Sequence, residues 1–292
     1  MSDQALFSHP RGAYALVTGA SQGLGRAFAK ELAREGRDLI LVALPDSGLP
    51  QAAREIRRAH GVRVHPIEVD LTASRGPEEV WTEIADRGLP VSTLVNNAGV
   101  GYNAYFVDST LGENEACILL NNLATVKLTR LALPELQRHP EAHVLNVASM
   151  AAYFAMPAMP VYAPSKAFVL NFSLALRQEL DGTSVGVSVL CPNGIRTNAE
   201  CRRKIEASGW AARLTCMDPG PVAACALRGM RAGKGVIVPG ALNRIIVALS
   251  SVAPQGLKYA VISRFWGRSA RGARAPVARQ RAGAASPQKS TA

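Results

Sequence analysis

The chain has 292 residues, 48% of them hydrophobic and 19% charged, and this globular composition excludes a largely disordered protein. Its formal net charge of +11 raises nucleic acid and acidic membrane surfaces as candidate partners. Residues 267–292 carry six basic and no acidic residues, which leaves +5 on residues 1–266, an ordinary charge for an enzyme. Without a recognisable nucleic-acid module, and with only 5% aromatic residues, the sequence predicts no nucleic-acid partner.

The beginning of the chain and the cysteines bear on location. Residues 1–11, a predicted N-terminal extension, precede a first apolar run at 13–17 that is too short for a signal sequence or a membrane span. The five cysteines form no CxxC pair and are odd in number, which predicts free thiols, no disulfide framework and no metal site. These features predict a soluble, cytoplasmic protein.

Short β-branched runs alternate with helical stretches through residues 12–266. This alternation predicts one α/β domain, a doubly wound parallel sheet of seven strands flanked by helices. Several runs are apolar throughout, as expected where helices bury both faces of a sheet. The candidate strands are residues 13–18, 38–43, 64–69, 93–96, 143–148, 185–190 and 235–238.

The first strand runs directly into residues 18–25 (TGASQGLG), and a helix over 24–35 follows. Leu24, Phe28 and Leu32 share one face of that helix. Glycines at such a place let the backbone approach a pyrophosphate, whose charge meets the positive end of the helix. A plain strand-to-helix turn is the alternative, but the position at the start of a strand–helix–strand unit favours nucleotide binding.

Polar residues also follow the third and fourth strands. Asp70 and Leu71 come after the third strand, and residues 96–99 (NNAG) come after the fourth. Both sites lie at carboxyl ends of strands, where open parallel sheets bind ligands. Each also fits an Asx turn, and that alternative stays open.

A helix predicted over 161–180 carries Tyr162 and Lys166 on one face, because they are four residues apart. A nearby ammonium stabilises phenolate and so favours a lowered pKa for Tyr162, suited to a general acid or base. Ser149 ends the fifth candidate strand, where its hydroxyl is placed to bind a substrate oxygen. YxxxK is common by chance, and by spacing alone a solvated lysine on an amphipathic helix is the favoured explanation.

The C-terminal part changes in character. Residues 242–252 are a short apolar helix candidate, and 257–266 are a second amphipathic piece. Residues 267–292 are rich in Ala, Gly, Arg, Ser and Pro without apolar periodicity, which predicts a disordered basic tail.

Taken together, these motifs resemble the short-chain dehydrogenase/reductase family. In order, the matches are TGASQGLG at 18–25, Asp70, NNAG at 96–99, Asn121, Ser149, YAPSK at 162–166 and PNGIRT at 192–197. The resemblance spans residues 12–266, and the joint spacing is far more specific than any single motif. It implies a Rossmann-type domain that transfers hydride between a nicotinamide nucleotide and a carbonyl or alcohol.

The resemblance also implies residue roles. Tyr162 would be the acid/base on the substrate oxygen, Lys166 would lower its pKa and hold the nicotinamide ribose, and Ser149 would orient the carbonyl. Asn121 would support a water-linked proton path, and the flanking pattern favours it over the adjacent Asn122. The residues implied to line the cofactor are Gly19, Ser21, Gln22, Gly23, Leu24, Gly25, Asp70, Leu71, Asn97, Ala98, Gly99, Tyr162, Lys166, Ile195 and Thr197.

Two positions depart from the family pattern. Asn193 stands where the family often has glycine, although Gly194 follows. The second strand ends at Ala43, where NAD-binding relatives carry an acidic residue, and Asp46 lies beyond Pro45 in a loop. Because no carboxylate stands there to repel a 2′-phosphate, the sequence favours NADP(H), with NAD(H) as the alternative.

Substrate class rests on the C-terminal third. By resemblance, residues 198–219 form a lid, in which Trp210 and apolar neighbours would cover a lipophilic substrate. Its basic cluster at 202–204 fits either an anionic substrate group or a solvated face, and we favour the solvated face. The layout after 218, VIVPG and then an apolar helix, resembles acyl- and steroid-type ketoreductases, which implies a hydrophobic carbonyl or alcohol.

Other interpretations stay open. A catalytically silent nucleotide sensor or scaffold is disfavoured, because such a protein has no need for Ser149, Tyr162 and Lys166 together. Residues 242–266 and the basic tail fit contact with anionic lipid, but closure of the domain or a subunit contact is favoured for such short helices. The apolar faces of the Tyr162 helix predict a homo-oligomer.

Overall fold

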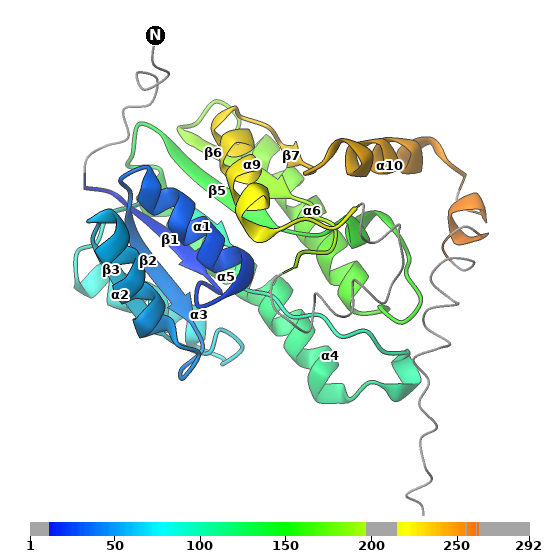
Figure 1. Ribbon diagram of the computed structural model, residues 1–292, viewed down its shortest axis with the longest axis horizontal. Helices are drawn as coiled ribbons and strands as arrows, with labels where there is room; N and C mark the ends of the chain where they lie inside the picture. The colour runs from blue at the N-terminus through cyan, green and yellow to red at the C-terminus, as the bar shows by residue number, and fades with distance from the viewer. Residues whose placement is uncertain (1–11, 197–214, 255, 261, 263–292) are drawn as a thin grey trace, which may run out of the picture.

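The computed structural model describes residues 12–196, 215–254, 256–260 and 262. Its centre is a seven-stranded sheet in the order β3-β2-β1-β4-β5-β6-β7, and every neighbouring pair is parallel (Figure 1). The strands are β1 (Tyr14–Thr18), β2 (Asp38–Ala43), β3 (Val64–Glu68), β4 (Val91–Asn96), β5 (Ala142–Val147), β6 (Val185–Leu190) and β7 (Val236–Ile237). The predicted α/β class and the doubly wound parallel sheet are confirmed.

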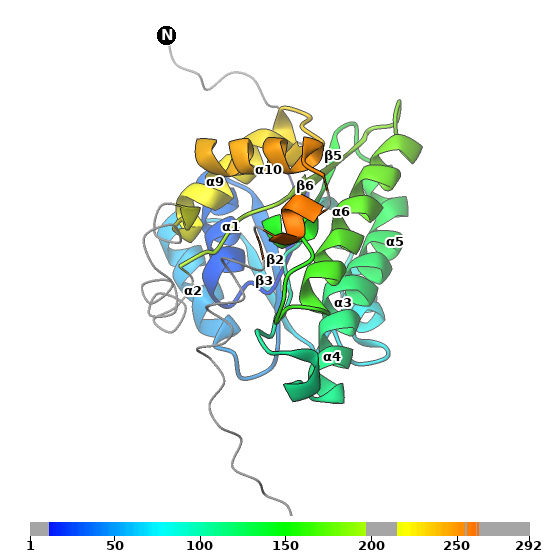
Figure 2. The same cartoon turned by 90° about the vertical axis from the view of Figure 1, so that its right-hand side faces the viewer.

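Helices cover both faces of this sheet (Figures 1 and 2). One layer contains α1 (Gly23–Arg34), α2 (Leu49–His60) and α9 (Pro219–Arg231), which share a core with the sheet. The other contains α3 (Gly76–Asp86), α5 (Thr125–Leu136) and α6 (Tyr162–Glu179). The remaining elements are η1 (Phe106–Asp108), α4 (Leu111–Ile118), the π-helical turn η2 (Leu119–Ala124), η3 (Met150–Tyr153) and α10 (Ala241–Val252).

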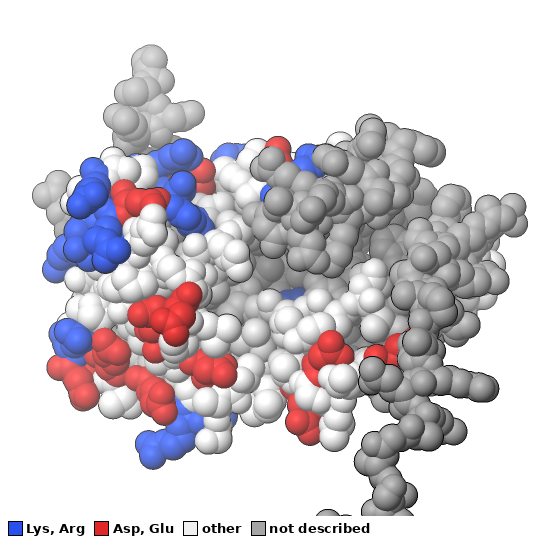
Figure 3. Space-filling view, turned by 60° about the horizontal axis from the view of Figure 1, so that its bottom comes forward, with Lys and Arg blue, Asp and Glu red and all other residues white. Residues whose placement is uncertain are grey.

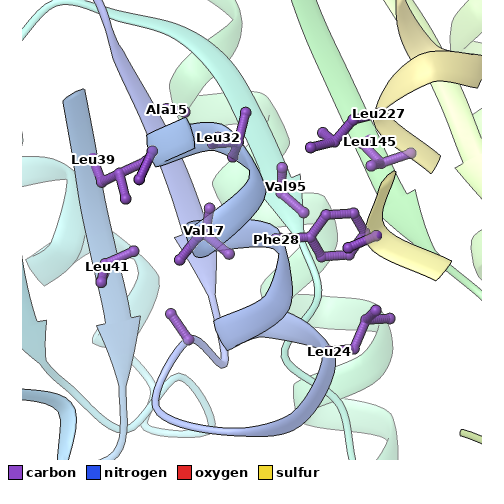
Figure 4. Close-up of a cluster of buried hydrophobic side chains, with 14 of the residues drawn as sticks. Ala15, Val17, Leu24, Phe28, Leu32, Leu39, Leu41, Val95, Leu145 and Leu227 are labelled. Carbon is purple, nitrogen blue, oxygen red and sulfur yellow. The ribbon is translucent and has the colours of Figure 1, made fainter. Parts of the chain in front are cut away.

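The core between α1 and the sheet shows why the glycine motif sits where it does. The predicted stripe Leu24, Phe28 and Leu32 is buried, and Phe28 lies between the sheet and Leu227 of α9 (Figure 4). Truncation of such a residue to alanine costs about 3–5 kcal/mol of stability. This packing fixes the start of α1, and therefore the glycine turn, against the end of β1.

Helices α4 and α5 join through η2 into one run, Leu111–Leu136, which is long and apolar enough to cross a membrane by length and composition alone. Leu128, Ala132 and Leu136 of this run are buried against the sheet, and η2 carries the buried side chain of Asn121. These contacts identify it as a core helix of the domain.

Several sequence predictions fall outside the described residues. They are the N-terminal extension 1–11, Thr197, the lid up to residue 214, most of the second C-terminal helical piece and the tail 267–292. The predicted extent of the domain, 12–266, therefore stays a prediction at its C-terminal end.

Candidate active site

The strand order reverses between β1 and β4, and the loops that follow these strands meet at the carboxyl edge of the sheet. In an open parallel sheet this is the place for a ligand. On the view toward this edge, the charged side chains of the described residues lie mainly to the left and below, and the described surface beside the central hollow is mostly uncharged (Figure 3).

The glycine turn after β1 is clamped by the loop after β4. Thr18 Oγ1 accepts hydrogen bonds from the backbone N–H groups of Asn97, at 3.0 Å, and Ala98, at 2.9 Å. In return, Asn97 Nδ2 donates to the Thr18 carbonyl at 2.8 Å. Asn97 thus joins the two predicted cofactor segments instead of forming an isolated turn.

Two glycines of this turn are required by space. A Cβ on Gly19, whose φ is +65°, would lie 2.9 Å from Asn97 Nδ2, and one on Gly25 would lie 2.1 Å from the Gly19 carbonyl oxygen. Helix α1 begins without a side-chain cap and without an acidic residue in its first turn. Its free N–H groups beside Ser21, Gln22 and Gly23 therefore fit a pyrophosphate.

The predicted adenine contacts have local roles in the structure. Asp70 Oδ1 accepts hydrogen bonds from the Thr72 backbone N–H, at 2.8 Å, and the Thr72 hydroxyl, at 2.7 Å, which is the Asx turn considered above. Leu71 is 5% exposed and belongs to the core, as does Leu24 at 7%. Asp70 is exposed and follows β3 at the carboxyl edge of the sheet, where a cofactor would lie.

Tyr162, Ser149 and Lys166 converge where β5 meets the first turn of α6. The Ser149 hydroxyl lies beside the Tyr162 phenol, whose pKa it lowers against the larger effect of burial, and Ser149 Oγ accepts the Ala151 N–H at 3.1 Å. Lys166 is 5% exposed, and its Nζ donates to the Val147 carbonyl at 3.0 Å. Within the described part of the chain, Lys166 makes no other hydrogen bond, so the remaining N–H groups of this ammonium fit ribose hydroxyls.

Burial has the largest effect on the pKa values of Lys166 and Tyr162. It lowers the pKa of Lys166 from 10.5 to about 8 and raises the pKa of Tyr162, which the Ser149 hydroxyl lowers in opposition. Lys166 Nζ lies 5.9 Å from the centre of the Tyr162 ring. The lowered Tyr162 pKa expected from the sequence is therefore not found in the chain alone, because desolvation outweighs the cation at this distance.

Asn121 reaches the same place from η2. Its Oδ1 accepts the Val100 N–H, and its Nδ2 donates to the Val100 carbonyl and to Ser165 Oγ, each at 2.9 Å. A Cβ on Gly99 would lie 2.9 Å from Asn121 Oδ1 and 3.1 Å from Lys166 Nζ. Asn122 instead donates to the Ser165 carbonyl at 2.8 Å, so Asn121 is the one that faces Lys166.

Sequence reasoning missed three parts of the site. The π-helical turn inserts a residue into the helix and directs Asn121 inward. Ser165 accepts from Asn121 and donates to the Tyr162 carbonyl at 2.7 Å. Gly101 leaves room for the Tyr162 ring, since a Cβ there would lie 2.6 Å from it. The repeated glycines of residues 99–101 were the one available sequence signal.

The segment after β6 holds the remaining predicted residues. Ile195 forms an isolated parallel bridge with Met217, which brings together the two ends of the undescribed stretch 197–214. Asn193 occupies its turn without a left-handed backbone, and its Oδ1 accepts the Gly194 N–H at 2.9 Å. The departure from glycine at this position is therefore accommodated.

A narrow hollow with a free volume of about 10 Å³ adjoins the tyrosine. Its lining contains no charged residue among those described. The lining residues are Tyr102, Ala104, Ser109, Asn114, Cys117, Pro160, Val161 and Tyr162.

Comparison with known proteins agrees with this geometry. The family model described as short chain dehydrogenase matches residues 13–207. Ketoacyl reductase HetN of Nostoc sp. is 35% identical over 61% of this chain, and 17-beta-hydroxysteroid dehydrogenase type 3 of Rattus norvegicus is 33% identical over 65%. The matches span 61% and 62% of these relatives' own lengths.

Solved structures match over a larger share. A short-chain dehydrogenase from Sphingobium yanoikuyae in complex with NADPH is 28% identical, with a TM-score of 0.70. The match covers 83% of this chain and 97% of that one. The fold is thus shared over nearly the whole of that structure.

Proposed function

The chain belongs to the short chain dehydrogenase family, and on this premise we propose that it interconverts a carbonyl and a secondary alcohol with a nicotinamide nucleotide. The observation that carries the proposal is the convergence of Ser149, Tyr162, Lys166 and Asn121 at the carboxyl edge of the sheet. A sensor or scaffold without chemistry would have no need to bury a lysine beside a tyrosine whose pKa, raised by burial, is lowered in opposition by a neighbouring serine hydroxyl.

In the reducing direction, Tyr162 donates its phenolic proton to the substrate oxygen while the carbonyl carbon gains a hydride. Ser149 donates a hydrogen bond to the same oxygen and fixes its position, as the Ala151 N–H fixes the serine. The phenolate that remains is stabilised by the Lys166 ammonium and by Ser149. Asn121 is a positioning residue that holds the loop at Val100, and a water-linked proton path beyond Lys166 stays a prediction.

Two of the segments described for the candidate active site would hold the cofactor. Gly19 to Gly25 would hold the pyrophosphate at the start of α1, and Lys166 would hold the nicotinamide ribose. When bound, the nucleotide supplies or accepts the hydride. The NADPH in the related Sphingobium structure supports this class of cofactor.

We expect a preference for NADP(H), because β2 ends without a carboxylate. Ala43 is its last residue, and Asp46 lies beyond it in a turn with a φ of 57°. Ala43→Asp is expected to lower kcat/KM for NADPH by roughly tenfold or more and to raise it for NADH, since a carboxylate repels a 2′-phosphate and binds a ribose hydroxyl. Turnover with both nucleotides at equal concentration measures this. Wild-type turnover with NADH that equals or exceeds NADPH would exclude the preference.

We propose a lipophilic substrate, which is supported by the ketoacyl and hydroxysteroid names of the relatives and by the lack of charged residues among the described residues beside Tyr162. The test is NADPH oxidation with a graded panel of ketones, 3-oxoacyl thioesters, aldehydes and sugars. We expect medium- or long-chain ketones or 3-oxoacyl compounds to be reduced. Turnover confined to polar sugars would overturn the substrate class.

We also propose a homo-oligomer through α4, η2 and α6. Ile118, Leu123 and Phe168 are 51%, 44% and 46% exposed, and Phe168 stacks on Phe172 with 6.1 Å between ring centres. Phe168→Glu is expected to convert the oligomer to monomer, since a charge at an apolar contact is costly. Light scattering after gel filtration measures the mass, with the exposed Lys30→Glu as control. A wild-type monomer, or an oligomer that Phe168→Glu leaves intact, would refute this contact.

A further inference from the structure

Helix α10 is attached to the domain by its polar side. Asn243 is 2% exposed, and its Nδ2 donates to the carbonyls of Pro239, at 2.9 Å, and Thr215, at 3.0 Å. Ser250 is also buried, at 8% exposed. The bond to Thr215 ties α10 to the domain, whereas Ser250 Oγ donates within the helix, to the Val247 carbonyl at 2.7 Å. The helix lies at the periphery of the molecule, outside the two helical layers (Figures 1 and 2).

The opposite side of α10 is apolar and faces outward. Its residues Leu242, Ile245, Leu249 and Val252, here called the α10 stripe, are 45%, 55%, 63% and 81% exposed. Their spacing of three, four and three residues places them on one face of the helix. A surface helix of a globular protein normally buries its apolar face, whereas α10 partly buries Ile246 and Val247 and leaves these four side chains exposed. A contiguous exposed apolar surface of this kind indicates a contact with a partner.

The distribution of charge indicates what kind of partner. All 22 acidic residues of the chain lie at or before Asp218, whereas 12 of the 33 basic residues follow it. Residues 1–218 therefore carry 21 basic and 22 acidic residues, and residues 219–292 carry a net charge of +12. Nine of the basic residues lie from Ala241 onward, including exposed Arg244 on α10 itself. An apolar stripe within such a segment is suited to a surface that is both apolar and anionic.

We propose that the α10 stripe and the basic sequence around it dock the protein on an anionic lipid bilayer. The apolar side chains would enter the boundary between headgroups and acyl chains, and the arginines and lysines would meet lipid phosphates. With 12 residues, α10 is too short to span a bilayer and would lie along its surface. A second copy of the chain fits less well, because it would bring another +12 segment to the same contact.

The test is co-sedimentation of the full-length protein with vesicles, at low salt. We expect binding to phosphatidylglycerol/phosphatidylcholine vesicles to exceed binding to phosphatidylcholine vesicles by roughly tenfold or more, and to fall as salt is added. Ile245→Gln with Leu249→Gln is expected to lower the binding by roughly tenfold, since it removes apolar groups from the stripe. The matched control is Leu44→Gln, because Leu44 is 54% exposed after β2, and it should bind as the wild type does.

A second variant tests the charge. Replacement of Arg268, Arg271 and Arg274 by glutamine should weaken binding to anionic vesicles and reduce its salt dependence. Equal binding to both vesicles, or full binding by the stripe variant, would overturn the proposal. So would a change of oligomeric mass caused by the stripe variant without lipid, which would identify the stripe as a contact between copies. Turnover of a soluble ketone should be unchanged in the stripe variant, so this result is independent of the proposed reaction.

Discussion

Tyr162→Phe is expected to lower kcat for carbonyl reduction by about three orders of magnitude, because it removes the proton donor and leaves the ring in place. The phenol lies beside the Ser149 hydroxyl at the carboxyl edge of the sheet. Phenylalanine keeps the contact between the ring and Gly101, so folding and cofactor binding should be largely unchanged. Steady-state turnover, together with a fluorescence titration of NADPH, measures both quantities.

The control is Tyr14→Phe, which removes a phenol hydroxyl from the start of β1, at the other end of the strand from the glycine turn. Its turnover should match the wild type. If Tyr162→Phe retains most of the activity, Tyr162 is not the proton donor. If the wild-type chain binds NADPH but reduces no carbonyl compound, the result favours a nucleotide sensor or scaffold over an enzyme.

The sheet was predictable because both of its faces are buried. Strands β2 (Asp38–Ala43) and β6 (Val185–Leu190) have the bounds expected from the sequence, and most of their residues are apolar. A strand inside a parallel sheet needs apolar side chains on both faces, so the run itself marks its length. The helix pattern was equally clear for α1. For α10 the same periodicity predicted a helix that would close the domain or form a subunit contact, but it could not show that Asn243 and Ser250 are the buried residues.

The site was predictable in its members but not in its connections. Spacing placed Tyr162 and Lys166 on one helical turn, and strand ends placed Ser149 and Asn97 at the same edge. The links between them are made by groups that carry no pattern in sequence, such as the Val147 carbonyl that accepts from Lys166 and the Ser165 hydroxyl beside Asn121. The π-helical turn is likewise invisible, because a single inserted residue leaves the composition of the helix unchanged.

The buried lysine has a second consequence, for stability. Lys166→Met should abolish turnover and yet raise the free energy of unfolding of the cofactor-free protein near pH 7 by about 2 kcal/mol. Burial lowers the pKa of Lys166 from 10.5 to about 8, so the folded state bears the cost of a desolvated ammonium at any pH below about 8. This pKa shift corresponds to a destabilisation of about 3 kcal/mol, which Lys166→Met removes. The variant also loses the hydrogen bond to the Val147 carbonyl, which costs about 1 kcal/mol and leaves the net gain stated above.

The pH dependence makes this prediction specific. Between pH 8 and pH 10.5 the unfolded chain binds more protons than the folded one, so the lysine penalty shrinks as the pH rises and is gone above the unfolded pKa. The stability difference between Lys166→Met and the wild type should therefore be largest at neutral pH and nearly vanish at about pH 10. Urea denaturation without cofactor at both pH values measures it, with the exposed Lys30→Met as control. A difference that is the same at both pH values would mean that Lys166 is not a desolvated cation. The expected result would show that the chain retains a destabilising charge at the position where the proposed reaction requires one.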